Sequence, residues 1–330
     1  MILEGLKRNW FLLGILAVIV LGLAFPDASS RLNPDSLTTT WIVVVLFLIT
    51  GLTLPSETIW RDMSDYRLHL FIQLYIFLFT PAYFWLSSRL LGPLLPSYLR
   101  IGVLALGCLP TTVSSCIVFT QLAQGNVVAA IFNSTLANTA GIVLSPLLIS
   151  FLLQSDAVSL PAGEALRLFR SLGLTIFLPF LAGQGARILF AKRFVDGRRA
   201  ALAVISNGLI LGIIFFAIAS SARHELLRAK AYRLLLPFAY LAFSHILLIF
   251  LSYWGARRFG FDGPGLITVV FVATQKTAAM GIPLLSVYFA SDRQTLAAAI
   301  LPLIFYHAWQ LLVAGLLKNS QVLRRIKERR

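Results

Sequence analysis

The sequence predicts an all-α membrane protein with ten transmembrane helices. Hydrophobic residues make up 58% of the 330 residues and charged residues only 12%, and the mean hydropathy is +0.84. Soluble domains are about 45–50% apolar and about 25% charged. Apolar segments of about 20 residues, the length that crosses a bilayer as a helix, recur along the chain. Since no long polar stretch separates them, we expect one polytopic membrane domain over residues 1–330.

The expected spans follow one another closely, at residues 9–25, 38–56, 69–88, 100–123, 126–153, 166–190, 200–221, 233–256, 264–289 and 294–318. The first span follows Lys7 and Arg8, and residues 26–30 form a poor signal-peptide cleavage site, so we interpret it as a retained helix. Lysine and arginine are more frequent in the loops on the side of the two termini. The positive-inside rule therefore places both termini in the cytoplasm of a multi-pass protein of the plasma membrane, which is the inner membrane in a bacterium.

Two spans are interrupted at matched positions in the two halves of the chain. The fourth breaks at residues 109–115, around Pro110, and the ninth at residues 273–277, around Lys276. Repeats over about 9–153 and 166–318 would each contain five spans, and because five is odd they would have opposite orientations in the bilayer. This pattern is typical of inverted-repeat transporters, whose broken helices meet at the substrate site near the midplane.

Polar side chains gather around both breaks. The candidate binding residues are Thr111, Thr112, Ser114 and Ser115 at the first break, Asn133, Ser134 and Asn138 on the fifth span, and Thr274, Gln275, Lys276 and Thr277 at the second break. Backbone groups freed by a break must face protein or a water-filled cavity, and restarting half-helices attract anionic groups. Two alternatives stay open: a proline kink explains either break taken alone, and the polar face of the fifth span suits interhelical hydrogen bonds equally well.

Lys276 is the most informative single residue, because it is the only lysine or arginine inside an expected span and away from its ends. A charge at the bilayer centre costs about 2.5–3.5 kcal/mol on insertion scales, so a functional role is the default hypothesis. The alternative is a side chain that snorkels to the interface. All acidic residues fall in loops or at helix ends, which leaves no buried carboxylate as a proton carrier. His245 and His307 lie in spans and either titrate or simply pack.

Several other classes of protein are disfavoured. The net charge of +15 is carried by short basic runs between apolar segments, which is the pattern of topology-setting loops rather than of nucleic-acid binding. Cys108 and Cys116 are eight residues apart on one expected span, about 12 Å along a helix, and are interpreted as packing residues. No nucleophile with its base, metal-ligand spacing or phosphate loop is present, so an enzyme is not expected. A passive channel fits less well, because no continuous polar stripe runs through several of the expected spans.

The motifs at the breaks resemble those of the bile acid:sodium symporter superfamily, and in particular its divergent SBF-like branch of proposed sodium-dependent transporters. The stretches that carry the resemblance are residues 108–115, 124–126, 133–138 and 275–283. The resemblance implies a 5+5 inverted repeat in which spans 4 and 9 cross at their breaks. It also implies a core of spans 3–5 and 8–10, a panel of spans 1, 2, 6 and 7, and a solute site in the cleft between them.

The resemblance further implies two sodium ions behind the crossover. Carried over by position, the first site would use Ser114, Ser115 and Ser134, and the second Thr274 and Gln275; Ser114, Ser115, Ser134 and Gln275 are thus the candidate sodium ligands. The acidic residue that both sites share in the family has no counterpart here, since Phe271 lies near that position, and Lys276 occupies the crossover. Because a cation beside an ammonium is strongly penalised, we hypothesise that Lys276 replaces at least one sodium by bonding carbonyls at both breaks.

These observations predict a secondary transporter for a small organic, anionic solute. Its expected partners are that solute and membrane lipid, with no nucleic acid, and Na⁺ is the one cofactor considered. The alternative is a membrane regulator that carries no solute and acts on ion or calcium homeostasis through a partner, as eukaryotic members of the same branch suggest.

Overall fold

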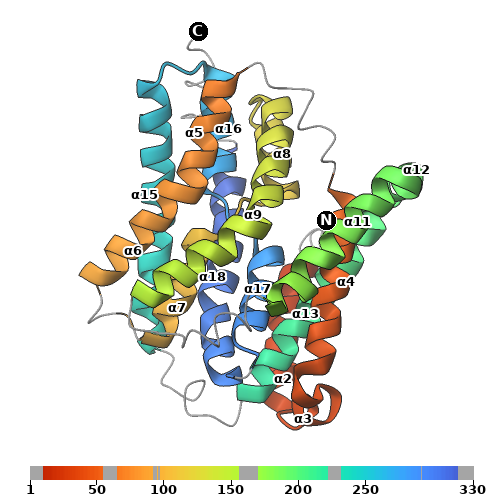
Figure 1. Cartoon of the computed structure of the whole chain (residues 1–330). Coiled ribbons are helices and arrows are strands. Elements are labelled where there is room, and N and C mark those ends of the chain that lie inside the picture. Colours follow the sequence, from red (N-terminus) through yellow and green to blue (C-terminus); the bar gives the residue numbers. More distant parts are fainter. Residues whose placement is uncertain are drawn as a thin grey trace, which may run out of the picture. The chain divides into compact units, whose positions relative to one another are not determined.

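The computed structural model describes residues 10–54, 65–91, 95, 97–155, 170–221, 232–290 and 292–318. Within these ranges the regular elements are all helices and no strand occurs (Figure 1). Eight helices are long and apolar enough to cross a membrane, and two shorter apolar helices cover Leu13–Ala24 and Leu99–Cys108. The all-α, multi-pass character is therefore confirmed, while the count of ten spans stays a prediction.

The main helices, in chain order, are α2 (Trp10–Ala24), α3 (Ala28–Leu32), α4 (Leu37–Thr53), α5 (Tyr66–Leu74), α6 (Thr80–Leu90), α7 (Ser97–Cys108), α8 (Ser114–Leu122), α9 (Val127–Ser155), α11 (Leu178–Ala186), α12 (Lys192–Asp196), α13 (Arg199–Ser221), α15 (Tyr232–Arg258), α16 (Gly263–Thr274), α17 (Ala278–Tyr288) and α18 (Arg293–Leu317). Three π-helical turns, η3 (Tyr75–Phe79), η5 (Gly173–Phe177) and η6 (Arg187–Ala191), continue into or out of these helices, and a short 3₁₀ turn, η1 (Pro34–Ser36), precedes α4.

The chain divides into two compact units. Unit 1 draws on Met1–Leu54, Leu160–Ala231 and Gly281–Ile300, and unit 2 on Pro55–Ser159, Tyr232–Met280 and Leu301–Arg330. Unit 1 is therefore built mainly on α2, α4, α11 and α13, and unit 2 on α5 to α9, α15, α16 and the second part of α18.

In unit 1, α4 and α11 pack backbone to backbone. A Cβ atom added to Gly51 would collide with the carbonyl oxygen of Phe180, and one added to Gly183 would collide with the carbonyl oxygen of Leu48. Small residues at such a contact let two membrane helices approach closely, because van der Waals packing replaces the hydrophobic drive that lipid cannot supply. The two glycines therefore fix how α4 lies on α11.

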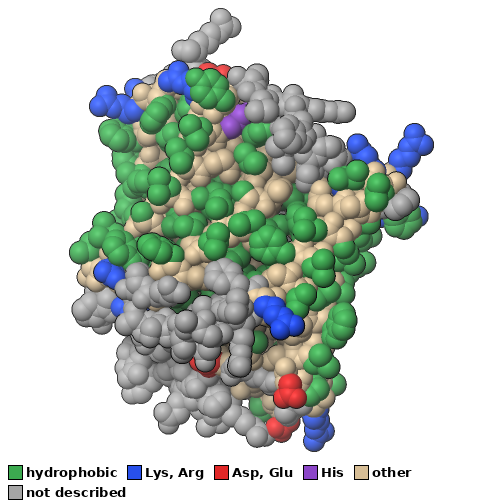
Figure 2. Space-filling model, in the orientation of Figure 1, with side chains coloured by type: hydrophobic (Ala, Val, Ile, Leu, Met, Phe, Trp, Pro, Cys, Tyr) green, Lys and Arg blue, Asp and Glu red, His purple; other side chains and the backbone are tan. Residues whose placement is uncertain are grey.

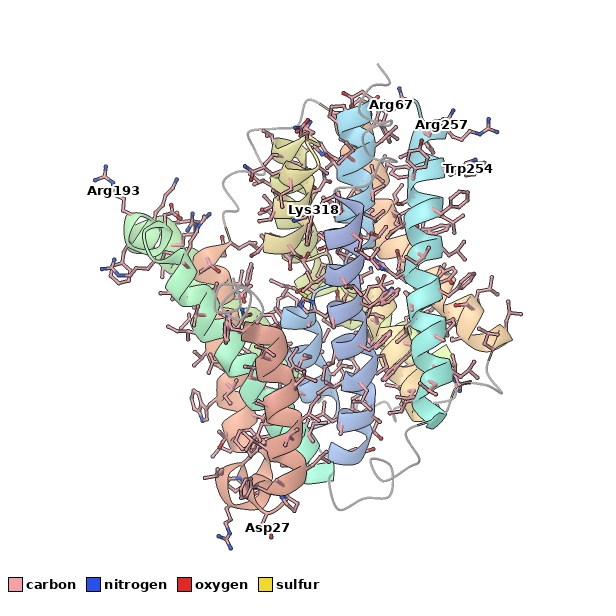
Figure 3. The ribbon with its side chains drawn as sticks, turned by 180° about the vertical axis from the view of Figure 1, so that it is seen from behind. Asp27, Arg67, Arg193, Trp254, Arg257 and Lys318 are labelled. Atoms are coloured by element: carbon pink, nitrogen blue, oxygen red, sulfur yellow. The ribbon has the colours of Figure 1, made fainter. Side chains whose placement is uncertain are left out.

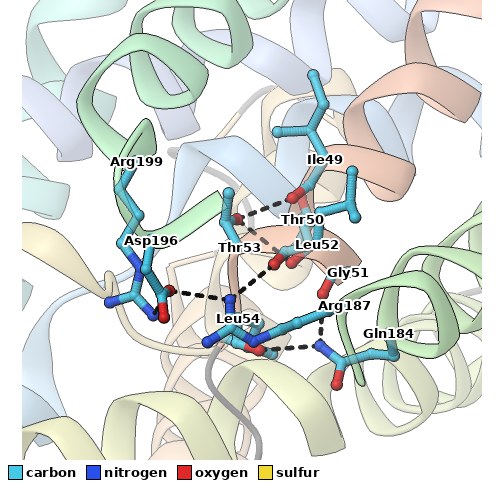
Figure 4. A network of polar contacts seen from close by, with 10 residues as sticks. All are labelled: Ile49, Thr50, Gly51, Leu52, Thr53, Leu54, Gln184, Arg187, Asp196 and Arg199. Atoms are coloured by element: carbon cyan, nitrogen blue, oxygen red, sulfur yellow. Dashed lines mark hydrogen bonds and ion pairs between the residues drawn. The ribbon is translucent and has the colours of Figure 1, made fainter. Parts of the chain in front are cut away.

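A buried arginine completes this contact (Figure 4). The side chain of Arg187 is 1% exposed, and its Nη1 donates to the Leu52 carbonyl and to Asp196 Oδ1, each at 3.1 Å. The Gln184 amide donates to the carbonyls of Gly51 and Leu54 at the C-terminal end of α4, where a helix's last carbonyls need partners outside the helix. Arg187 falls near the end of the expected span over residues 166–190, where a basic residue gives no signal of burial, and so the sequence analysis missed a second buried cation.

Both expected helix breaks are present in the described chain. α7 ends at Cys108 and α8 begins at Ser114, which leaves residues 109–113 outside regular helix. α16 ends at Thr274 and α17 begins at Ala278, which leaves residues 275–277 non-helical. Each break is therefore two residues shorter than expected, because Ser114 and Ser115 already belong to α8 and Ala273 and Thr274 still belong to α16.

Candidate functional site

The carbonyl groups of the first break are fully used. A helix end leaves its last carbonyls without intrahelical donors, and in a membrane each of these must find another partner. All six carbonyls from Gly107 to Thr112 accept a hydrogen bond. Three of the donors come from other helices or from the second break: Ser145 Oγ to Cys108 at 2.7 Å, the Thr277 N–H to Pro110 at 3.0 Å, and Asn138 Nδ2 to Thr111 at 2.8 Å.

Lys276 supplies two more of these donors. Its Nζ atom lies 3.0 Å from the Gly107 carbonyl oxygen and 2.8 Å from that of Leu109, and the residue is 1% exposed. The side chain therefore does not snorkel to an interface. The ammonium lies at the C-terminal end of α7, where the helix dipole and the freed carbonyls favour a cation.

The third partner of the ammonium is the Ile76 carbonyl, at 3.2 Å, and its availability follows from a neighbouring proline. In the π-helical turn η3 the Thr80 N–H bonds the Tyr75 carbonyl instead of that of Ile76. The next residue, Pro81, has no N–H to offer. Ile76 is thereby left with a carbonyl directed to a partner outside its own helix. The ammonium was expected to bind carbonyls at both breaks, and this is wrong in one respect. It binds carbonyls at the first break, but its third partner belongs to η3 and not to the second break.

The second break is held by α18. The amide of Gln310 pairs with both backbone groups of Lys276: its Oε1 accepts from the N–H and its Nε2 donates to the carbonyl, each at 2.8 Å. Tyr306 Oη donates to the Thr274 carbonyl at 3.0 Å. The sequence analysis missed both residues; the only signal was a glutamine and a tyrosine four residues apart in an apolar helix.

Three side-chain oxygens, from the two breaks and from the first turn of α8, meet in a cluster, which we call the oxygen triad. Thr112 Oγ1 lies 2.5 Å from Gln275 Oε1, and Ser115 Oγ lies 2.6 Å from Thr112 Oγ1 and 2.7 Å from Gln275 Oε1. Two hydroxyl protons cannot serve all three contacts, so one contact brings two oxygen lone pairs together. Gln275 Nε2 is buried without a hydrogen-bond partner among the described residues. Oxygen groups so arranged are the ligand type that hard cations prefer.

The remaining candidates divide into two groups. Lys276 and Thr277 link the second break to the first, and Asn138 links α9 to the first break, as described above. Asn133 Nδ2 lies 2.8 Å from His69 Nδ1, and its side-chain oxygen accepts from Gln73, so it forms interhelical bonds with α5. Ser134 Oγ and Thr274 Oγ1 bond carbonyls one turn back in their own helices, and Ser114 is exposed.

Apolar helices that are interrupted at two points, with the two breaks in contact, are typical of the class of membrane transporters with discontinuous helices. Residues 9–322 match the SBF-like CPA transporter family, and the chain belongs to that family. It is therefore a membrane transporter and not an enzyme.

Curated relatives align over nearly the whole chain. Sodium/bile acid cotransporter 7-B of Xenopus laevis is 31% identical over 326 residues, covering 96% of this chain and 92% of the relative. Sodium/bile acid cotransporter 7 of Mus musculus is 30% identical and covers 96% and 93% of the two chains. An uncharacterized protein of Pseudomonas aeruginosa is also 30% identical, with the same coverage of 96% and 93%.

Proposed function

We propose that this chain is a secondary active transporter that moves a small organic anion across the plasma membrane by alternating access. The observation that carries the proposal is the direct link between the two breaks, from Lys276 and Thr277 to the carbonyls of Gly107, Leu109 and Pro110. Broken helices joined in this way can bind a solute where they meet and respond to it together. The family match supports transport, and the solute class is our own inference.

We infer a 5+5 inverted repeat of ten helices with both termini cytoplasmic, in which spans 4 and 9 cross. Spans 3–5 and 8–10 would form the core and spans 1, 2, 6 and 7 the panel. The separation of unit 1, built on α2, α4, α11 and α13, from unit 2 supports this division. One segment differs: Gly281–Ile300 is grouped with unit 1, whereas spans 9 and 10 were both assigned to the core.

An anionic solute suits the breaks because two half-helices restart there. α8 begins at Ser114 and α17 at Ala278, and helix N-termini present unpaired N–H groups and a positive dipole end. Ser114 is exposed in the first turn of α8, and Ala279 is exposed between two buried neighbours in the first turn of α17. The relatives named sodium/bile acid cotransporter 7 support a small solute as the transported species.

For coupling, we propose one sodium ion at the oxygen triad of Thr112, Ser115 and Gln275. The second cation is built into the chain as the Lys276 ammonium. Gln275 and Lys276 are adjacent in sequence, but their side chains reach different partners. Gln275 can therefore help to hold a sodium ion while the Lys276 ammonium binds the carbonyls of the first break. Ser114 and Ser134, expected as sodium ligands, do not join the triad through any bond among the described residues.

The transport proposal is tested with the full-length protein in sealed liposomes. A panel of radiolabelled organic anions is offered with an inward sodium gradient or with equal choline, alongside empty liposomes. Uptake that depends on protein and saturates for at least one anion supports transport, and acceleration by the gradient supports sodium coupling. The alternative, a regulator without a solute, predicts no protein-dependent uptake of any anion and a partner that copurifies with the chain.

The sodium site is tested by binding, using two adjacent serines. A ligand present at a hundred times its Kd stabilises the folded state by about 2.7 kcal/mol. We expect sodium, compared with choline, to raise the Tm of the wild type and of Ser114→Ala, whose side chain is exposed outside the triad. Ser115→Ala should lose most of this rise. An equal sodium effect in the two variants would show that sodium binds elsewhere.

A further inference from the structure

A groove of about 560 Å³ runs along the outer face of α5, η3 and α6 in unit 2. Its lining residues recur every four positions between Tyr66 and Ala82, so they form one stripe along the helix. The stripe is about 24 Å long at 1.5 Å per residue, which exceeds the roughly 15 Å depth of one leaflet of the hydrocarbon core. Figure 2 shows hydrophobic side chains over this face, with lysine and arginine side chains at its upper end.

The wall of the groove is aromatic and held in place. The rings of Tyr75 and Phe79 stack at 4.7 Å, and Phe71 meets the edge of Phe259 at 5.3 Å. Tyr75 Oη donates to the Leu248 carbonyl of α15 at 2.6 Å, which fixes its ring. The wall is therefore preorganised, and a ligand that binds there does not need to order it.

One end of the groove is basic. Arg67 lines it directly, and Phe259, another lining residue, follows Arg257 and Arg258 in the sequence. Figure 3 shows Arg67 and Arg257 at the same end of this unit. The nearby carboxylates Asp65 and Asp262 each accept a hydrogen bond from a backbone N–H in the first turn of a helix, at 3.1 and 2.8 Å. These acids thus serve as helix caps. The side chains of Arg67 and Arg257 are exposed, while the Arg258 guanidinium lies over the ring of Trp254.

We propose that this groove binds one anionic phospholipid, with an acyl chain along the aromatic wall and the headgroup phosphate on Arg67. The apolar length of the groove matches an acyl chain, and the Arg67 guanidinium at its end matches an anionic headgroup. The topology inferred from the loop charges places Arg67, Arg257 and Arg258 on the cytoplasmic side, whose leaflet carries the anionic lipids.

The lipid would also contact the solute machinery, a step that rests on the proposed function. Tyr75 and Phe79 are the first and last residues of η3, and the carbonyl of Ile76 in the same turn binds the Lys276 ammonium. An acyl chain lying on the exposed ring of Phe79, which stacks on the buried ring of Tyr75, supports the π-helical turn that presents this carbonyl. Lipid binding itself is measured without transport, so the two proposals can fail separately.

The test uses delipidated full-length protein in detergent, titrated with phosphatidylglycerol or phosphatidylcholine and followed by native mass spectrometry. One basic residue near a membrane surface is worth about 1 kcal/mol, or about fivefold in affinity. We expect phosphatidylglycerol to bind about fivefold more tightly than phosphatidylcholine, and Arg67→Gln to abolish this preference. Arg193→Gln, which removes an exposed arginine in unit 1, should retain it. Leu74→Trp, at a half-exposed lining position, should weaken the binding of both lipids.

Three outcomes would overturn the proposal. Equal affinity of the wild type for the two lipids would remove the role of the basic end. An equal loss of preference in Arg67→Gln and Arg193→Gln would indicate general charge attraction. Unchanged lipid binding in Leu74→Trp would place the lipid outside the groove. As a further arm, glycerol phosphate that competes fully with the lipid would identify a headgroup site without an acyl-chain groove.

Discussion

Replacement of Lys276 tests whether its ammonium stands where a cation would otherwise bind. Lys276→Ala removes the charge and leaves space beside the carbonyls of Ile76, Gly107 and Leu109. Lys276→Met removes the same charge but fills the space. In choline the alanine variant should be less stable than the methionine variant by about 2–3 kcal/mol, since it buries roughly three fewer methylene-sized groups at about 0.8 kcal/mol each. Both variants lose the charged hydrogen bonds and also escape the cost of burying the charge.

In sodium this difference in stability should close, because Lys276→Ala gains a stabilisation that Lys276→Met lacks. The vacated carbonyls of Lys276→Ala can hold a sodium ion, and a hundredfold excess over Kd adds about 2.7 kcal/mol to whatever the oxygen triad contributes. With an unfolding entropy of about 2.1 cal/mol/K per residue, this corresponds to an additional rise in Tm of about 4 °C for 330 residues. Lys276→Met should respond to sodium only as the wild type does.

The assay is thermal unfolding of the purified variants across a sodium series at constant ionic strength, with choline as the replacement cation. Sodium-driven uptake by the same variants provides a second readout. Identical sodium responses of Lys276→Ala and Lys276→Met would refute the idea that the ammonium replaces a cation. A Lys276→Ala protein with wild-type stability, uptake and sodium dependence would refute any role for this residue.

Three further substitutions test how the breaks are built. Gln310→Leu leaves two buried backbone groups of the second break without partners and should cost about 2–4 kcal/mol in thermal unfolding; an unchanged Tm would mean that other groups replace the amide. Gly141→Ala places a Cβ atom 2.8 Å from the proline ring of the first break and should destabilise by about 1–3 kcal/mol, whereas Gly315→Ala meets nothing within 4 Å and should be neutral or stabilising. Pro81→Ala supplies a new N–H that competes for the Ile76 carbonyl, so uptake should fall while Tm holds or rises; unchanged uptake would show that this carbonyl is dispensable.

The features predicted correctly from the sequence are those that appear in side-chain patterns. Long apolar segments gave the all-helical membrane class, and Pro110 with the polar residues around it located the first break. Lys276 stood out because a cation inside an apolar span is costly and therefore rare. The structure places this ammonium against the first break. This was expected because the two breaks occupy matched positions in the two halves of the chain.

Other parts of the site could not be predicted, because backbone atoms carry no sequence signal of their own. The Ile76 carbonyl is available only because η3 shifts the hydrogen-bond register by one residue before Pro81. Gln310 reads as an ordinary polar residue near the end of a span, and its role depends on the fold that brings α18 to residue 276. Arg187 follows an apolar run, where a basic residue normally indicates a loop, although it is 1% exposed.

The two cation positions that we propose share one structural element, and this has a consequence for coupling. The triad uses Thr112, while the ammonium binds the carbonyls of Gly107 and Leu109 on the other side of Pro110. A sodium ion at the triad raises the local positive charge and thereby weakens the hold of the ammonium, since like charges repel strongly in a low-dielectric interior. An anion that offsets this charge must strengthen sodium binding. Because binding free energies are reciprocal, sodium strengthens the binding of the anion by the same factor. The fixed charge of Lys276 thus offers a physical reason why sodium and an anion would bind together at these breaks.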